Sequence, residues 1–379
     1  MAERPVHFPG LNGLRALAAV SVVVSHITLR LKEFGLDPFI FGAFEDGRPR
    51  GLDLASHGVT IFFALSGFLI TSLLLAEHGP KGTNKVNILY FYNRRILRIW
   101  PLYYAYFAVV LVVLFAQGRP PSGTSLALYA FFAANVAFLT TEWVVVPIAH
   151  FWSLAVEEQF YMFWPWVLRK RTTILLWICL LGIAVQFLAK LICYKWYPDP
   201  LVTAFIGITR FHCMLIGAAA AVLHANGTPW FRKLTDNRFT QIIAWSVIAL
   251  LLLNRFHIAS IIDTEIVACI TVLIIMGQLS TTNKVLDLDR PLLDRLGKIS
   301  YGIYVIHPLI IYVMTNWMDR MFDRASAGGG VCPPLRNSSG GYHRGCPALL
   351  YLPRAAFPSY KEQVYSGGKP IRTFGVRLK

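Results

Sequence analysis

The sequence predicts an all-α fold, a polytopic integral membrane bundle of about nine to ten transmembrane helices. Hydrophobic residues make up 55% of the 379 residues and charged residues only 15%, and the mean hydropathy is +0.52. These values are far from those of soluble domains. Eight apolar runs are each long enough to cross a hydrocarbon core of about 30 Å as a helix, and they cover residues 11–29, 57–76, 99–117, 172–193, 203–225, 238–254, 261–280 and 299–318.

Two further apolar segments are ambiguous. Segment 125–141 is short, and segment 151–168 carries Glu157, Glu158 and Gln159 in its middle. A re-entrant or cavity-lining segment can hold either of them, because such backbone is tolerated at membrane depth where protein or water surrounds it.

The basic residues predict the orientation. They cluster in four connections, which hold Lys81, Lys85, Arg94, Arg95 and Arg98; Arg169, Lys170 and Arg171; Arg232, Lys233 and Arg238; and Lys284, Arg290, Arg295 and Lys298. All four clusters share the side of the N-terminus if one ambiguous segment crosses fully and the other does not. Cytoplasmic loops carry the excess of Lys and Arg, so we expect a cytoplasmic N-terminus, nine full crossings and one re-entrant segment.

Several function classes are unsupported by the sequence. The net charge of +16 lies in short membrane-proximal loops, where a topogenic role explains it better than nucleic-acid binding. The cysteines show no metal or disulfide pattern: four lie in apolar helices as small hydrophobes, and Cys332 and Cys346 lie in the C-terminal tail. No Walker A loop, GxGxxG turn or GxSxG elbow is present.

Two ionisable residues, Arg15 and His26, stand in the first apolar run, in the stretch GLRALAAVSVVVSH. Eleven helical steps of about 100° return to nearly the same face, roughly 16 Å further along the axis. Ionisable groups inside a membrane span are costly and usually functional. An arginine near one surface with an imidazole deeper suits an anionic ligand and proton transfer. The alternative is a snorkelling arginine and a histidine bonded to a neighbouring helix.

A second basic pattern occurs in FYNRRILRIWPLYY, where Arg95 and Arg98 stand three positions apart on one helix face. Arginine binds phosphate through paired donors, so the pair is a candidate phosphate site, with topogenic charge as the alternative. In FFALSGFLIT, the small residues Ser66 and Gly67 favour close helix packing over a chemical role.

The stretch HFWSLAVEEQFYMFWPW contains the adjacent carboxylates Glu157 and Glu158. Neighbouring positions on a helix face different directions, so at most one of them is expected to point into a functional cavity. A buried carboxylate either pairs with an arginine of another helix or becomes neutral, and both outcomes stay open.

The stretch ISYGIYVIHP places Ser300, Tyr304 and His307 at i, i+4 and i+7, on one helical face. A hydrogen-bonded helix contact and a part in a functional site are both compatible with this spacing.

Taken in order, GLRALAAVSVVVSH, FFALSGFLIT, FYNRRILRIWPLYY, FWSLAVEEQFY and SYGIYVIHP resemble the acyltransferase 3 family of bacterial membrane proteins, from about residue 8 to about residue 318. The resemblance implies transfer of an acyl group, usually acetyl from acetyl-CoA, to a hydroxyl of an extracytoplasmic carbohydrate such as lipopolysaccharide, exopolysaccharide or peptidoglycan. It implies a protein of the bacterial inner membrane whose partners are the lipid bilayer, acyl-CoA and the carbohydrate acceptor, with no permanently bound cofactor.

The resemblance also assigns roles by motif. It implies that His26, Glu157 and Arg15 are catalytic and that Arg95 and Arg98 bind coenzyme A, whose phosphates are cytoplasmic. We expect Glu157 near His26 or Arg15, and Glu158 in a less demanding contact. Histidine can serve as base or nucleophile near neutral pH. Further polar positions, substrate-binding or structural, are Trp152, Ser153, Ser300, Tyr304 and His307.

The chain divides into an acyltransferase 3-like transmembrane domain, residues 1–322, and a tail, residues 323–379. The tail is rich in Gly, Pro, Ser and Arg, which predicts disorder, whereas a typical family member continues into a last apolar helix. Two other functions remain open: a membrane transporter, and a non-catalytic subunit of a polysaccharide-assembly complex.

Overall fold

The computed structural model describes residues 8–31, 36–37, 39, 42, 51, 53–77, 87–140, 142–169, 172–196, 200–253, 255–259 and 261–327. Every regular element in these ranges is helical, so the all-α expectation is confirmed for them. The elements are α1 (Leu11–Thr28), α2 (Leu54–Glu77), α3 (Ile88–Ala116), α4 (Gly123–Ala130), the 3₁₀ turns η2 (Val136–Leu139) and η3 (Val146–Ile148), α5 (Phe151–Val167), α6 (Thr172–Lys195), α7 (Pro200–Ile208), α8 (Phe211–Ala225), α9 (Pro229–Thr235), α10 (Arg238–Leu252), α11 (Asp263–Leu279), α12 (Pro291–Lys298) and α13 (Ser300–Ala327).

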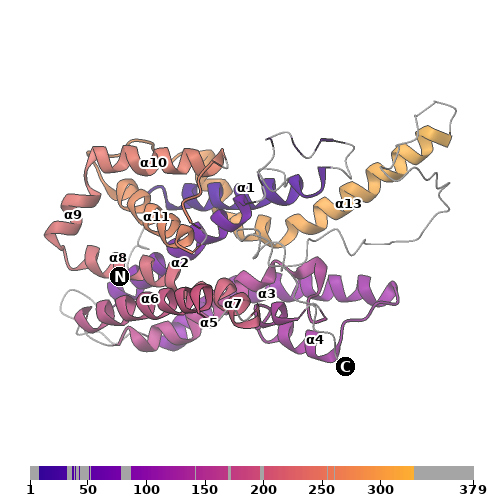
Figure 1. The fold of residues 1–379 in the computed structure, drawn as a ribbon, viewed down its shortest axis with the longest axis horizontal. Coiled ribbons are helices and arrows are strands. Elements are labelled where there is room, and N and C mark those ends of the chain that lie inside the picture. The colour runs from indigo at the N-terminus through magenta and orange to yellow at the C-terminus, as the bar shows by residue number, and fades with distance from the viewer. Residues whose placement is uncertain are drawn as a thin grey trace, which may run out of the picture.

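The helix α2 lies at the centre of the bundle (Figure 1), where it contacts α1, α8 and α11. In the most apolar stretch of 18 residues in α2, 67% of the residues are buried, whereas in the corresponding stretch of α6 only 11% are buried. Glycines bring α2 and α8 together: a Cβ on Gly67 would collide with the Met214 backbone, and one on Gly217 with the Ala64 backbone. Small residues let membrane helices approach closely. The packing interpretation of Gly67 is therefore confirmed.

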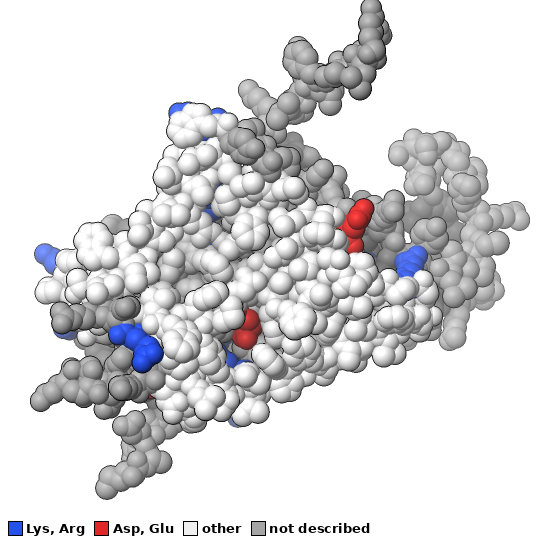
Figure 2. Space-filling model, turned by 90° about the horizontal axis from the view of Figure 1, so that it is seen from below, with Lys and Arg blue, Asp and Glu red and all other residues white. Residues whose placement is uncertain are grey.

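The outer helices expose apolar side chains. Trp177 and Leu181 of α6 are 67% and 66% exposed, and Val112 of α3 is 69% exposed. The face seen from below in Figure 1 carries few charged side chains among the described residues (Figure 2). A soluble monomer rarely presents so large an apolar surface, whereas a lipid-facing surface requires it. The chain is accordingly a polytopic membrane protein.

The expected count of nine to ten spans is wrong. Within the described residues, five helices are long and apolar enough to cross a membrane, or six if the bent pair α12–α13 forms one span. The helices α5 and α11 have 17 residues each and α10 has 15. At about 1.5 Å per residue, these lengths fall short of a hydrocarbon core of about 30 Å. The segment 125–141 divides into α4 and η2.

Three interruptions place polar backbone inside the bundle. The span 201–225 is broken between α7 and α8 at Thr209 and Arg210, and α12 meets α13 at 67°. The chain between α4 and α5 is irregular, and there the buried Asn135 exchanges hydrogen bonds of 3.1 and 2.8 Å with Gln159. Irregular backbone at membrane depth needs such internal partners, and two of these interruptions adjoin the site described below.

The helix α3 begins at Ile88, eleven residues before the apolar run at 99. The Asn87 side chain caps it by accepting a hydrogen bond of 3.0 Å from the backbone N–H of Tyr90. Its first three turns therefore carry Arg95 and Arg98.

At the other end, α13 continues to Ala327, five residues beyond the expected domain boundary at 322. The remainder of the expected tail, with Cys332 and Cys346, lies outside the described residues. Within the described residues, Cys179, Cys193, Cys213 and Cys269 are all free thiols.

Candidate active site

Two histidines from opposite ends of the sequence meet at the contact between α1 and α13. The Nδ1 atom of His26 lies 2.7 Å from Nε2 of His307, and the rings are stacked with centroids 4.9 Å apart. The Nδ1 atom of His307 lies 2.7 Å from the carbonyl oxygen of Tyr304. Pro308 follows His307 and has no N–H, so it cannot donate the helical hydrogen bond to that carbonyl. The carbonyl is therefore free to accept from the imidazole.

The direction of each hydrogen bond follows from this carbonyl. A carbonyl oxygen only accepts, so Nδ1 of His307 carries a hydrogen and Nε2 of the neutral ring has a lone pair. That lone pair accepts from Nδ1–H of His26. The Nε2 atom of His26 then carries the remaining lone pair, and no hydrogen bond to it occurs within the described ranges. His26 is thus held as the tautomer that can take a proton at Nε2.

A second cluster joins α5 to the same helix α13. The hydroxyl oxygens of Ser153 and Tyr304 are 2.6 Å apart, and they lie 3.2 and 3.0 Å from the backbone oxygen of His150. The His150 ring is buried, its Nε2 donates to the carbonyl of Val305 over 3.2 Å, and its centroid is 5.5 Å from that of His307. Ser153 and Tyr304 therefore stand beside the histidine pair.

His150 is the residue that sequence reasoning missed. It immediately precedes FWSLAVE and is the N-cap of α5, with no side-chain cap hydrogen bond. The signal that was available is its position between an irregular segment and the motif helix, where a buried polar side chain needs a specific partner.

A charged group lies at the other end of α1. The Glu157 carboxylate is within hydrogen-bonding reach of the Ser66 and Tyr161 hydroxyls and interacts electrostatically with Arg95 and Arg15. The guanidinium carbon of Arg95 lies 4.9 Å above the Tyr161 ring. This places Glu157 with Arg15 rather than with His26, whose hydrogen bond goes to His307.

Ser66 takes part in this charged group. Its hydroxyl forms a hydrogen bond with that of Tyr161. The motif SGFLIT thus contributes a polar contact through Ser66 and helix packing through Gly67.

Glu158 points elsewhere, as two adjacent helical positions must. One carboxylate oxygen lies 3.5 Å from the indole nitrogen of Trp100, and the other is buried without a hydrogen-bond partner in the described ranges. This environment is more demanding than the contact expected for Glu158, because an unpaired buried oxygen loses its hydration.

The remaining expected positions separate into different surroundings. The Ser300 hydroxyl donates to the Gly297 carbonyl over 2.8 Å at the α12–α13 bend, so it does not join Tyr304 and His307. Arg98 is exposed, and its positive charge repels that of Arg15. The Trp152 ring lies beneath the guanidinium of Arg210, 5.5 Å from its carbon.

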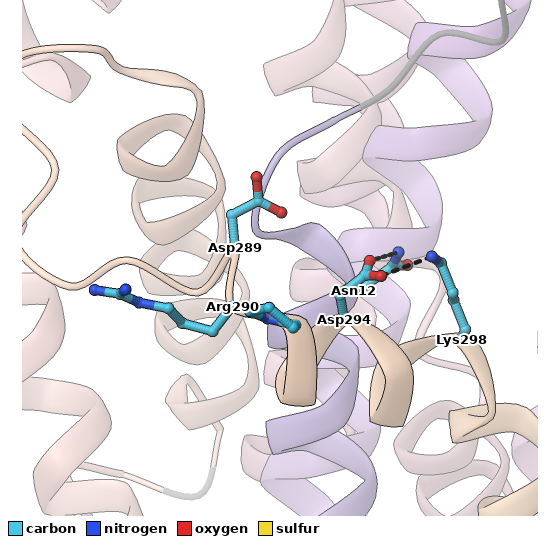
Figure 3. Close-up of a pocket in the computed structure, with 6 residues that line it drawn as sticks. Asn12, Asp289, Arg290, Asp294 and Lys298 are labelled. Atoms are coloured by element: carbon cyan, nitrogen blue, oxygen red, sulfur yellow. Dashed lines mark hydrogen bonds and ion pairs between the residues drawn. The ribbon is translucent and has the colours of Figure 1, made fainter.

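A surface pocket of about 440 Å³ opens where α12 meets the start of α1; its lining residues are Asn12, Asp289, Arg290, Pro291, Asp294 and Lys298. Asp294 accepts a hydrogen bond of 2.8 Å from Asn12 and forms an ion pair of 2.6 Å with Lys298 (Figure 3). Arg15 donates to Asn12 over 3.3 Å. The pocket thus adjoins the arginine end of α1, away from the histidine pair.

Comparisons with known proteins identify the family of this chain. The family model described as the acyltransferase domain, acyltransferase 3, matches residues 8–324. The chain belongs to the acyltransferase 3 family. Its matched region includes every residue of the histidine pair, the hydroxyl cluster and the charged group.

Curated members of the family are distant relatives. YrhL of Bacillus subtilis, provisionally named a peptidoglycan O-acetyltransferase, is 28% identical over 350 residues, covering 82% of this chain and 49% of YrhL. The O-acetyltransferase OatA of Staphylococcus aureus is 26% identical over 348 residues, covering 83% of this chain and 52% of OatA. The chain thus spans about half the length of these relatives. No solved structure matches it.

Proposed function

We propose that this chain is a membrane O-acetyltransferase that moves an acetyl group from cytoplasmic acetyl-CoA to a hydroxyl of an extracytoplasmic glycan. Its N-terminus and the basic start of α3, with Arg95 and Arg98, face the cytoplasm of a bacterial inner membrane. The peptidoglycan named for YrhL makes an amino-sugar glycan the favoured acceptor class. The observation that carries the proposal is the tautomer of His26, which leaves a lone pair on Nε2, in a histidine pair whose second ring, His307, adjoins Tyr304.

The reaction needs one base. Nε2 of His26 takes the proton of the acceptor hydroxyl as its oxygen attacks the thioester carbonyl of acetyl-CoA, and the carbon–sulfur bond then breaks. The proton passes from the imidazolium to the departing thiolate, so charge and atoms balance. A positioned base of this kind typically contributes about 10²–10⁴-fold in rate. His307 holds the imidazole through Nδ1 throughout.

The charged group at the opposite end of α1 suits the donor. Arg95 and Arg98 are in the first three turns of α3, and Arg98 is exposed with no ion pair among the described residues. A guanidinium can engage the phosphates of coenzyme A through paired donors. The Glu157 carboxylate interacts with the charges of Arg95 and Arg15, and it forms no ion pair with Arg98 among the described residues.

Mass spectrometry of surface glycans tests this function in cells that contain or lack the chain. We expect an acetyl mass difference that depends on the chain and disappears with His26→Ala at equal membrane abundance. A transporter instead moves labelled substrate and leaves the glycan without acetyl. A non-catalytic subunit tolerates His26→Ala.

A further inference from the structure

Arg210 lies at the break between α7 and α8, and only two of its three guanidinium nitrogens are hydrogen-bonded among the described residues. Its Nε donates to the carbonyl of Gly207 over 3.2 Å, and its Nη1 donates to the Ser56 carbonyl over 3.2 Å and to the Thr60 hydroxyl over 3.1 Å. These acceptors are uncharged. The Nη2 nitrogen has no hydrogen-bond partner in the part of the chain that is described, so two N–H donors of a rigidly held cation remain available.

The neighbouring carboxylates have partners other than Arg210. Lys190 pairs with Glu265 over 2.7 Å, and the same carboxylate is bonded by the Thr264 hydroxyl over 2.9 Å. Asp263 pairs with His257 over 2.7 Å and accepts two further bonds from backbone N–H groups. Arg210 therefore has no carboxylate partner among the described residues. An uncompensated cation inside a membrane domain is costly and indicates a function.

An aromatic ring and the reacting groups adjoin this cation. The Arg210 guanidinium carbon is 5.5 Å from the centroid of Trp152, and Trp152 directly precedes Ser153, whose hydroxyl is 2.6 Å from that of Tyr304. The charge of Arg210 also acts on Tyr304. Tryptophan presents a broad apolar face suited to the C–H face of a pyranose, and a free guanidinium pairs with carboxylate or phosphate.

We propose that Arg210 and Trp152 form an acceptor subsite that binds an anionic sugar, with Nη2 of Arg210 on its carboxylate or phosphate and Trp152 against its ring. The subsite rests on the proposed function, because it places a hydroxyl of the bound sugar beside Ser153, Tyr304 and the histidine pair. It gives the enzyme selectivity for anionic over neutral glycans.

Sugar binding to the full chain in lipid nanodiscs tests the subsite without requiring turnover. In each of two ligand pairs, one member carries an anionic substituent that the other lacks: the disaccharide N-acetylglucosaminyl-N-acetylmuramic acid, with a lactyl ether, against di-N-acetylchitobiose, and N-acetylglucosamine 1-phosphate against N-acetylglucosamine. We expect the anionic member of at least one pair to bind about 10- to 100-fold more tightly, the usual effect of a hydrogen bond to a charged group. The pair that shows the preference identifies carboxylate or phosphate as the group bound.

Protein variants locate the preference. Arg210→Gln should abolish it and Arg210→Lys should keep part of it, whereas Arg255→Gln removes an exposed positive charge before α11 and should leave it intact. Because Arg210→Gln also loses the hydrogen bonds to Ser56 and Thr60, the methyl ester of the muramic acid ligand provides a test on the unmodified protein. Esterification should remove any preference for the free acid.

The outcomes separate this inference from the proposed function. Equal binding of the charged and neutral members of both pairs, or a preference that survives in folded Arg210→Gln, overturns the subsite, even if acetyl transfer occurs. A preference that depends on Arg210, together with no transfer of acetyl from acetyl-CoA, supports the subsite and contradicts the proposed function.

Discussion

Nδ1 of His26 lies 2.7 Å from Nε2 of His307, although the two residues are 281 positions apart. Pro308 explains why this pair has a defined direction. Because the proline has no N–H, the Tyr304 carbonyl accepts from His307 instead. One backbone carbonyl thus determines which nitrogen of His26 can act as a base.

We predict that His307→Ala lowers kcat by about 10²-fold or more, because a general base that loses its orienting partner adopts the wrong tautomer. His307 is a positioning residue, so the KM for acetyl-CoA should stay unchanged. His307→Asn can still accept a hydrogen bond from Nδ1 of His26 and should recover part of kcat. Steady-state kinetics in nanodiscs separate these effects, and a rise in KM with unchanged kcat would assign His307 to donor binding instead.

Glu157 and Glu158 provide a matched comparison. Glu157→Gln removes a carboxylate that interacts with the charges of Arg95 and Arg15, and we expect it to lose most acetyl transfer. Glu158→Gln neutralises a carboxylate that already has one unpaired buried oxygen, so it should retain most activity. Transfer rates at equal membrane yield test the pair. Activity that survives in Glu157→Gln but not in Glu158→Gln would reverse the assignment.

Arg95→Lys and Arg98→Lys keep the basic charge and remove the planar fork that binds phosphate. We predict that both raise the KM for acetyl-CoA, with a smaller change in kcat. Arg94→Lys is the control, because Arg94 is already paired with Glu77 over 2.5 Å. Identical kinetics in all three variants would leave Arg95 and Arg98 with a topogenic role only.

The connection between α9 and α10 should respond to acid. Hydrogen bonds from Ser280 and Asn283 lower the pKa of Asp236. Since the folded pKa lies below the unfolded value of about 3.9, the contribution is present above that value and is lost as pH falls through the folded pKa. We predict that Ser280→Ala reduces the loss of thermal stability between about pH 5 and pH 3. An unchanged pH dependence in this variant would show that the hydrogen bond from Ser280 does not lower the pKa of Asp236.

Much of the site could be predicted from motifs, but its pairing could not. The spacing of Tyr304 and His307 indicated one helical face, yet nothing local indicates that His26 is the partner, because the contact depends on how α1 and α13 pack. Ser300 shares that spacing but turns to the Gly297 carbonyl at the α12–α13 bend. The bend lies where the apolar run 299–318 begins, and hydropathy does not indicate the angle between α12 and α13.

The number of spans was overestimated for a related reason. Hydropathy counts apolar residues, but a membrane crossing also requires a helical segment of sufficient length. The segments that became α5, α10 and α11 are too short for this. Arg210 was also overlooked, although it lies inside the apolar run 203–225, because the sequence does not show which groups surround it.

Acetyl transfer by the purified full chain in nanodiscs tests the central claim most directly. Acetyl-CoA labelled in the acetyl group is incubated with a glycan acceptor and wild-type protein, His26→Ala, or the control His257→Ala, whose imidazole is exposed. We predict labelled glycan with wild type and the control, and a rate lower by about 10²–10⁴-fold with His26→Ala. Undiminished labelling by a correctly folded His26→Ala variant would contradict the role of His26 as the base.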